Sequence, residues 1–152
     1  ETLQSLQRLA GLPSLAIYLP LLMGTGGNSG SQASTLVIRG LAVGELAPKD
    51  ALKILWKELR ISFLLGVSLS LINLVKILFI DGQEISVGIT VCAAQVLVIV
   101  LAKCLGGMLP LLAKKVGIDP ALMAAPLIST LTDTFSCLIY FTLAAAIFHI
   151  AY

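Results

Sequence analysis

The 152-residue chain is 58% hydrophobic and 12% charged, and its mean hydropathy is +1.02. Soluble domains are about 45–50% apolar and about 25% charged, so this composition predicts one integral membrane domain over residues 1–152. A formal net charge of +2 is too small to indicate nucleic acid as a partner. The three cysteines lie in apolar runs without metal-ligand spacing, so we expect free thiols packed in the interior.

Four apolar segments follow one another, each longer than the roughly 20 residues needed to cross a bilayer. They predict spans over about residues 13–43, 59–80, 85–112 and 120–150. Pro20 is expected to kink the first span. Because no strand-like alternation occurs, we predict an all-α, polytopic membrane helix bundle with four transmembrane helices.

The basic residues are unevenly distributed between the two ends of these spans. Five flank the first connection and two flank the third, whereas the opposite side has two. The positive-inside rule therefore predicts that residues 44–55 and 114–120 are cytoplasmic in a multi-pass protein of the cell membrane. A basic face is also expected on a helix from Pro48 to Arg60, where the repeating residues are Lys49, Lys53, Lys57 and Arg60.

The first span carries an unusual polar and glycine-rich stretch, GTGGNSGSQASTLVIRG, at residues 24–40. Helical spacing places four polar residues of this stretch on one stripe: Asn28, Gln32, Thr35 and Arg39. Such a stripe faces either a helix partner or a water-filled path, and the pattern alone leaves both interpretations open.

Asp133 is the acidic residue nearest the middle of the membrane, whereas the other seven lie in loops or near span ends. An ionisable group at that depth is costly, which makes Asp133 a candidate functional residue. Ser129, Ser136 and Tyr140 share its helical stripe. The alternative is structural, with Asp133 paired to Lys103 or accepting hydroxyl hydrogen bonds in a packed interior.

The first and fourth spans are expected to be antiparallel, which places Asn28 and Asp133 at similar depths. Their polar stripes can therefore face the same cavity. A competing chemical interpretation is the G-x-S-G pattern at Gly27–Gly30, which is typical of rhomboid intramembrane proteases. The single histidine, His149, lies about 20 Å or more from the depth of Ser29, so we interpret this match as accidental.

Two long motifs closely resemble the MgtE-type magnesium channels. They are GTGGNSGSQASTLVIRGLAVGEL in the first span and IDPALMAAPLISTLTDTFSCLIYF in the last. The resemblance implies a homodimer whose pore lies on the two-fold axis, lined by these two spans. It also implies a magnesium site at Asp133 from each subunit, with Ser129 beside it and Asn28 in the glycine–asparagine motif.

The chain departs from the family pattern in three respects. The family has five membrane spans, so we expect that a first helix is missing upstream of Glu1. We likewise expect that the family's cytosolic magnesium-sensing domains are missing from this sequence. Some members carry Asn at the position of Ala125, and the contact which that Asn makes to the ion is expected to be lost here.

The predicted function is transport of hydrated Mg²⁺, since this ion dehydrates reluctantly and is held through its waters by one or two carboxylates. The expected partners are a second copy of the chain, membrane lipid and Mg²⁺, with Mn²⁺, Co²⁺ and Ni²⁺ left open. No covalent chemistry is implied, so the chain is predicted not to be an enzyme. Two alternatives are kept, a membrane scaffold whose polar stripes only pack helices and an intramembrane serine hydrolase.

Overall fold

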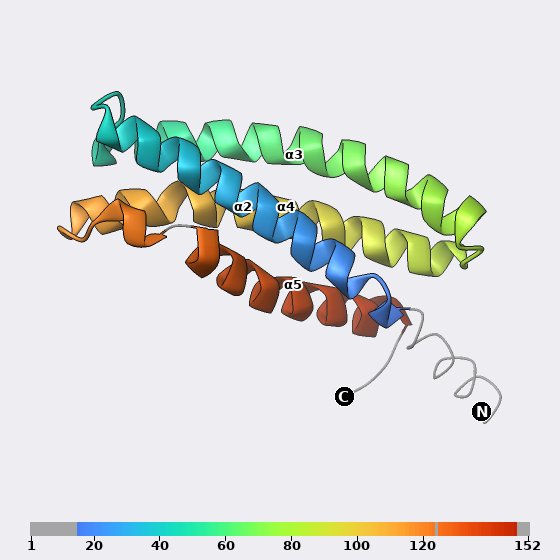
Figure 1. Cartoon of the computed structure of the whole chain (residues 1–152). Coiled ribbons are helices and arrows are strands. Elements are labelled where there is room, and N and C mark those ends of the chain that lie inside the picture. Colours follow the sequence, from blue (N-terminus) through green and yellow to red (C-terminus); the bar gives the residue numbers. More distant parts are fainter. Residues whose placement is uncertain (1–14, 124, 149–152) are drawn as a thin grey trace.

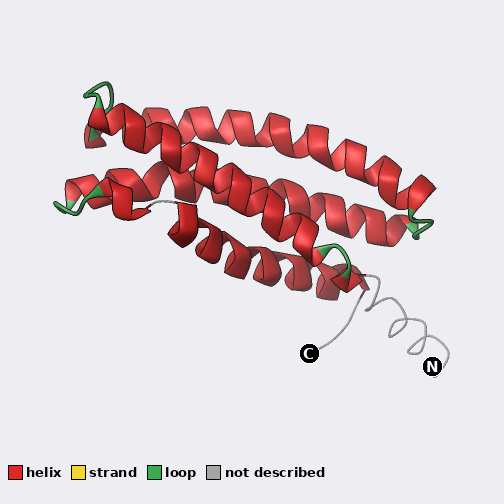
Figure 2. Cartoon of the chain, in the orientation of Figure 1, coloured by secondary structure: helices red, strands yellow, loops and turns green. Residues whose placement is uncertain are grey.

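The computed structural model describes residues 15–123 and 125–148, and every regular element within them is helical (Figure 2). Its long helices lie side by side (Figure 1) and are α2 (Leu19–Ala42), α3 (Ala51–Val75), α4 (Ile85–Lys115) and α5 (Ala125–Phe148). The all-α prediction is therefore confirmed. Three of these helical segments are long and apolar enough to cross a membrane: Pro48–Ile80, Ile85–Lys115 and Pro126–Phe148.

α2 is long but is not among those three, because glycine and polar side chains fill its centre. It lies against the other helices instead of presenting apolar residues all round. α4 contacts α2, α3 and α5, and α5 also contacts α2. By contrast α2 and α3 barely contact each other, although they are consecutive in the chain. Grooves lined by side chains of both helices therefore lie between α2 and α3.

The apolar run predicted as the second span, residues 59–80, is part of a longer helix. A short 3₁₀ turn, Pro48–Asp50, leads directly into α3 at Ala51, so the basic segment and the apolar run form one helix. The Asp50 carboxylate accepts a hydrogen bond from the Ala47 backbone N–H at 2.9 Å, which stabilises this start. At its other end α3 continues through a π-helical turn, Lys76–Ile80.

The connections between these helices each contain a glycine just beyond a helix. Gly44, Gly82 and Gly117 have φ angles of 77°, 62° and 79°, a region that residues with a Cβ rarely adopt. The prediction for Pro20 is wrong, because this residue lies in the first turn of α2, where the N–H it lacks has no helical partner. It begins the helix and does not kink it.

Two apolar clusters stabilise the ends of the bundle. The larger lies at the end where α2 begins and α5 ends, and it includes Leu22, Ile77, Val91 and Tyr140. The smaller lies near the α2–α3 connection and contains Val37, Leu41, Ile54 and Leu111. Between these clusters the helices approach one another through small residues.

Candidate functional site

One face of α2 packs closely on its neighbours through glycines. A Cβ added to Gly26 would lie 2.7 Å from the Val98 side chain of α4, and one added to Gly30 would lie 2.7 Å from Ile128 of α5. A Cβ added to Gly106 of α4 would overlap the backbone carbonyl of Gly30. The glycines of the predicted motif therefore permit close helix packing.

The opposite face of α2 carries the polar stripe. Asn28, Gln32, Thr35 and Arg39 are all exposed. A groove of about 470 Å³ follows the first part of this face. Asn28, Thr25 and Gln32 line it from α2, and Leu65 and Leu69 line it from α3. The glycines thus lie on the closely packed face of α2, and the stripe lies on an exposed face.

Asp133 lies half-exposed on α5. Within residues 15–123 and 125–148, its carboxylate has no hydrogen bond and no ion pair. The alternative pairing with Lys103 is wrong, because the Lys103 ammonium lies 3.4 Å from the Glu58 carboxylate of α3 instead. Asp133 therefore keeps an unpaired carboxylate in the middle of an apolar helix.

Ser129 lies at nearly the same level as Asn28. A Cβ added to Gly27, next to Asn28, would lie 3.4 Å from the Ser129 Cβ. Asp133 is one helical turn further along α5, about 6 Å away along its axis. The three predicted site residues thus occupy similar depths on two neighbouring helices.

Asp133 does not line the groove between α2 and α3, which is walled by those two helices alone. Asn28 lines that groove and Asp133 does not, so this groove alone does not bring the two predicted site residues together.

The hydroxyl groups around Asp133 donate to their own helix. Ser129 donates to the Pro126 carbonyl at 3.1 Å, and Thr130 donates to the same oxygen at 2.9 Å. Thr134 donates to the Thr130 carbonyl at 3.0 Å. Because the Thr130 and Thr134 protons are engaged, the oxygens of these two hydroxyls can act as acceptors. The edge of α5 near Asp133 therefore presents oxygen acceptors, which suit the water protons of a hydrated cation.

The predicted stripe on α5 divides into two parts. Ser136 and Tyr140 are 1% and 0% exposed, and they face the interior. Ser136 donates to the Thr132 carbonyl at 2.6 Å, and the Tyr140 hydroxyl donates to the Leu15 carbonyl at 2.8 Å. These two residues stabilise packing and take no part in the exposed site.

Among the described residues, no group of three His, Cys, Asp or Glu side chains is close enough to hold a metal ion. At the depth of Asp133, one chain thus offers one carboxylate with hydroxyl acceptors beside it. Ser29 of the hydrolase alternative is only 4% exposed, and His149, the base that this alternative would need, lies outside the described residues.

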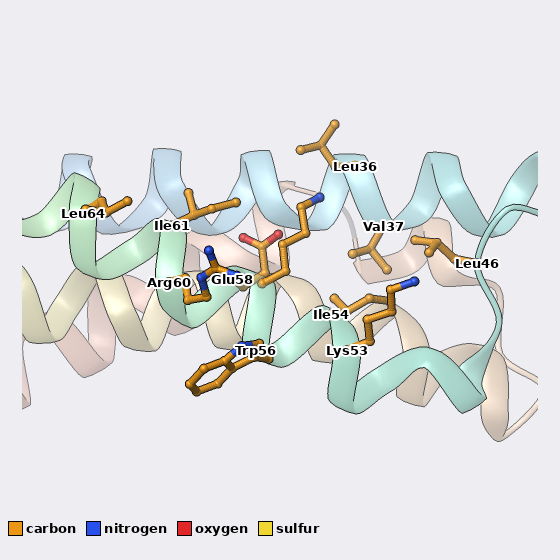
Figure 3. A pocket seen from close by; sticks show the side chains of 11 residues that line it. Leu36, Val37, Leu46, Lys53, Ile54, Trp56, Glu58, Arg60, Ile61 and Leu64 are labelled. Atoms are coloured by element: carbon orange, nitrogen blue, oxygen red, sulfur yellow. The ribbon is translucent and has the colours of Figure 1, made fainter.

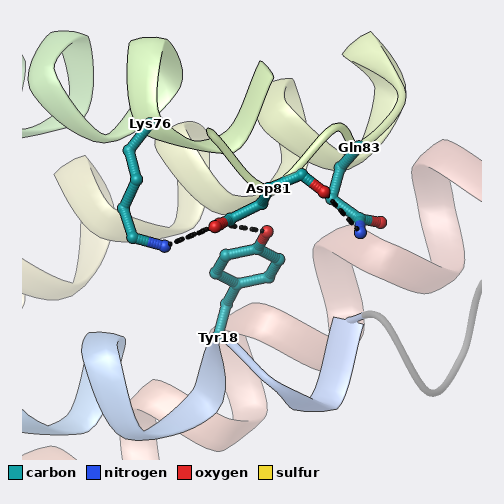
Figure 4. A network of polar contacts seen from close by, with 4 residues as sticks. All are labelled: Tyr18, Lys76, Asp81 and Gln83. Atoms are coloured by element: carbon teal, nitrogen blue, oxygen red, sulfur yellow. Dashed lines mark hydrogen bonds and ion pairs between the residues drawn. The ribbon is translucent and has the colours of Figure 1, made fainter. Parts of the chain in front are cut away.

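The sequence did not indicate a polar network at the end of the bundle where α2 begins. The Asp81 carboxylate accepts hydrogen bonds from the Tyr18 hydroxyl at 2.8 Å and from the Lys76 ammonium at 2.6 Å, and Gln83 donates to its backbone carbonyl (Figure 4). Hydrogen bonds from Lys76 and Tyr18 lower the pKa of Asp81. Burial, followed by the bond to Asp81, raises the pKa of Tyr18 to about 12.

The chain is similar to known transport proteins over most of its length. A family model described as the divalent cation transporter MgtE matches residues 19–143. Proteins called magnesium transporter MgtE are 40% identical in Thermus thermophilus and 32% identical in Bacillus subtilis, each over 136 residues. One from Enterococcus faecalis is 29% identical over 131 residues. These matches cover 90%, 90% and 86% of this chain, but only 30%, 30% and 29% of the relatives.

Proposed function

Because the chain belongs to the MgtE family of divalent cation transporters, we propose that it forms the ion-conducting part of a magnesium transporter. The family consists of transporters and not of enzymes, so the hydrolase alternative is set aside. The relatives are called magnesium transporters, which makes Mg²⁺ the transported ion of this proposal and a substrate instead of a resident cofactor.

The observation that carries the proposal is the unpaired Asp133 carboxylate in an apolar helix. A charge in that position costs at least a few kcal/mol unless a counter-charge compensates it. A dication passing between two copies of the chain would compensate two such carboxylates at once. In this proposal Asp133 of each protomer faces the two-fold axis of a homodimer and binds the ion through its water shell.

Ser129 and Asn28 complete the proposed path. The Ser129 hydroxyl donates to the Pro126 carbonyl of its own helix, and a hydroxyl oxygen that donates its proton can also accept a hydrogen bond, as from a water of the ion. Asn28 is exposed at a similar depth on the neighbouring helix, and its amide oxygen offers a further acceptor. Recognition of a hydrated ion by size and charge then favours Mg²⁺ over more easily dehydrated Ca²⁺.

Transport down the electrochemical gradient requires no covalent step. A dication gains about 4.6 kcal/mol for each 100 mV of membrane potential that it crosses. A scaffold protein would use its polar stripe to pack helices, whereas here glycines pack the helices and the stripe is exposed. This favours a conducting function over a scaffold.

The proposed topology places the two basic connections, residues 44–55 and 114–120, in the cytoplasm. They lie together at one end of the bundle, opposite the turn at residues 81–84 (Figure 1). In a cysteine-free background, Cys introduced at Lys49 or Lys115 should react with a membrane-impermeant maleimide only after the cells are opened. Labelling of both positions in intact cells would contradict this topology.

Flux into liposomes tests the function itself. The protein should admit Mg²⁺ down an imposed gradient, and Asn28→Leu should reduce this flux at least tenfold, because a branched apolar side chain would obstruct the wet face of α2. Ser68→Leu is the matched control, since it makes a similar polar-to-leucine change at an exposed position outside the groove. Equal Mg²⁺ flux in wild type and Asn28→Leu would exclude this face from the path.

A further inference from the structure

A second groove between α2 and α3 has a chemistry that ion conduction does not use. It has a volume of about 580 Å³ and lies near the connection between the two helices, at the other end of the gap from Asn28. Figure 3 shows the side chains that line it from both helices and from Leu46 of the connection. One part of this lining is basic and the other part is apolar.

The basic part comes from the first turns of α3. Lys53, Lys57 and Arg60 line the groove at helical spacing, and all three are exposed. Glu58 also lines it, but its side chain is only 3% exposed and is paired with Lys103 at 3.4 Å. The acidic charge is therefore balanced from within the bundle. Three cations remain along the groove without an acidic partner among the described residues.

The apolar part continues along both helices toward the middle of the bundle. Leu36 and Val37 line it from α2, and Ile61 and Leu64 line it from α3. Leu36 and Leu64 are 56% and 69% exposed, so the packed bundle does not cover this strip. The groove thus has basic side chains at one end and an apolar strip along the rest of its length.

The length of α3 places this change of chemistry at the edge of the membrane. The helical segment Pro48–Ile80 has 33 residues, about 50 Å, whereas the hydrocarbon core of a bilayer is about 30 Å thick. Residues 61–80 alone span about 30 Å. Arg60 therefore lies at the level of the phosphates when this apolar run fills the core. Trp56, which is 64% exposed, lies one turn further out, where interfacial aromatic residues occur.

We propose that this groove binds one anionic phospholipid. Its phosphate is held by Arg60 with Lys53 and Lys57, and one acyl chain lies along Leu36, Val37, Ile61 and Leu64. Basic pockets between membrane helices recognise anionic head groups in this way. An apolar protein helix would leave the three cations unpaired, and a free phosphate ion would leave the apolar strip unused. The proposal does not depend on magnesium conduction, and lipid binding is measured separately from flux.

Trp56 is the single tryptophan of the chain, and it lines the groove, so its fluorescence reports on the occupant. The protein is reconstituted in two sets of phosphatidylcholine vesicles. One set also contains phosphatidylglycerol with brominated acyl chains, and the other contains phosphatidylcholine with brominated acyl chains. Brominated phosphatidylglycerol should quench Trp56 at a mole fraction about tenfold lower than brominated phosphatidylcholine. Soluble glycerol phosphate at millimolar concentration should not relieve this quenching, whereas relief would indicate a site for free anions and overturn the lipid assignment.

Two triple variants with the same net charge separate the groove from the general surface charge. Lys53→Gln/Lys57→Gln/Arg60→Gln should lose the preference for phosphatidylglycerol. The control, Lys49→Gln/Lys114→Gln/Lys115→Gln, removes three charges from the same end of the chain and should keep that preference. All six side chains are exposed, so both variants should fold, which the helical circular dichroism checks.

Three further results would overturn the proposal that the groove binds an anionic phospholipid. The first is equal quenching by the two brominated lipids in the wild-type protein. The second is an equal loss of preference in both triple variants, which would indicate attraction to the surface as a whole. The third is a Trp56 that neither lipid quenches, which would show that protein covers the groove.

Discussion

The hydroxyl of Tyr18 connects the start of α2 to the turn between α3 and α4, because it donates to Asp81. The pKa of Tyr18 in the folded protein is about 12, whereas that of an unfolded tyrosine is about 10. The folded state therefore favours the protonated phenol. This contribution to stability is complete below pH 10 and is lost as the pH rises through about 12.

The thermal unfolding midpoint of the wild-type protein should consequently fall more steeply between pH 10 and pH 12 than that of Tyr18→Phe. Tyr140 is present in both proteins, so its titration cancels in the comparison. Differential scanning fluorimetry across this pH range provides the measurement. Parallel curves would show that the Tyr18 hydroxyl has no part in the alkaline loss of stability.

At the same scale, charged residues differ in what can be predicted from the sequence. Asp133 could be identified from the sequence as a charged residue within an apolar helix, because it interrupts an apolar run far from any turn. The burial of Glu58 could not be predicted, since this residue stands among basic residues and resembles part of a solvated helix face. Its burial depends on Lys103, which is 45 residues later in the chain and comes close only when α3 packs on α4.

At the scale of the helices, close packing through glycine determines how α2 lies in the bundle. Gly106→Ala would place a methyl group against the backbone of Gly30, which cannot move aside as a flexible side chain does. We expect Gly106→Ala to lower the free energy of unfolding by about 1–3 kcal/mol. Gly24→Ala is the matched control, because no atom lies within 4 Å of the added Cβ.

Gly24→Ala should stabilise the protein by about 0.5–1 kcal/mol, since alanine loses less conformational freedom in a helix than glycine does. Unfolding in detergent by a denaturant provides both values. If the two variants changed stability equally, the contact between α2 and α4 would not be as close as the structure shows.

The sequence predicted the elements well where local chemistry determines them. The ends of the apolar runs indicated the connections, and in each of them a glycine adopts the positive φ that the turn requires. The helix expected from Pro48 to Arg60 is continuous with the apolar run that follows it, because the change from basic to apolar residues near Leu59 does not interrupt the helix. The gap between α2 and α3 was not predictable, because it depends on how α4 contacts both of them.

At the scale of the whole molecule, the proposed pore requires two chains. The described part of one chain offers Asp133 as an unpaired carboxylate at this depth, and no group of three metal-binding side chains. The assignment of Asp133, Ser129 and Asn28 to an ion site stays a prediction from the sequence. How two chains pair depends on surfaces that only their association brings together, so that arrangement stays a proposal.

Calorimetric titration with Mg²⁺ tests whether two Asp133 carboxylates bind one magnesium ion. Asp133→Asn keeps the shape of the side chain but removes both charges from the proposed dimer. Asp119→Asn is the control, because this loop residue keeps an oxygen that can accept the hydrogen bond from the Ala121 N–H. Light scattering checks that each variant has the same oligomeric state as the wild-type protein. We predict that Asp133→Asn loses one Mg²⁺ site per two chains, whereas Asp119→Asn keeps it. If Asp133→Asn kept the same number of sites with wild-type affinity, Asp133 would not bind the magnesium ion.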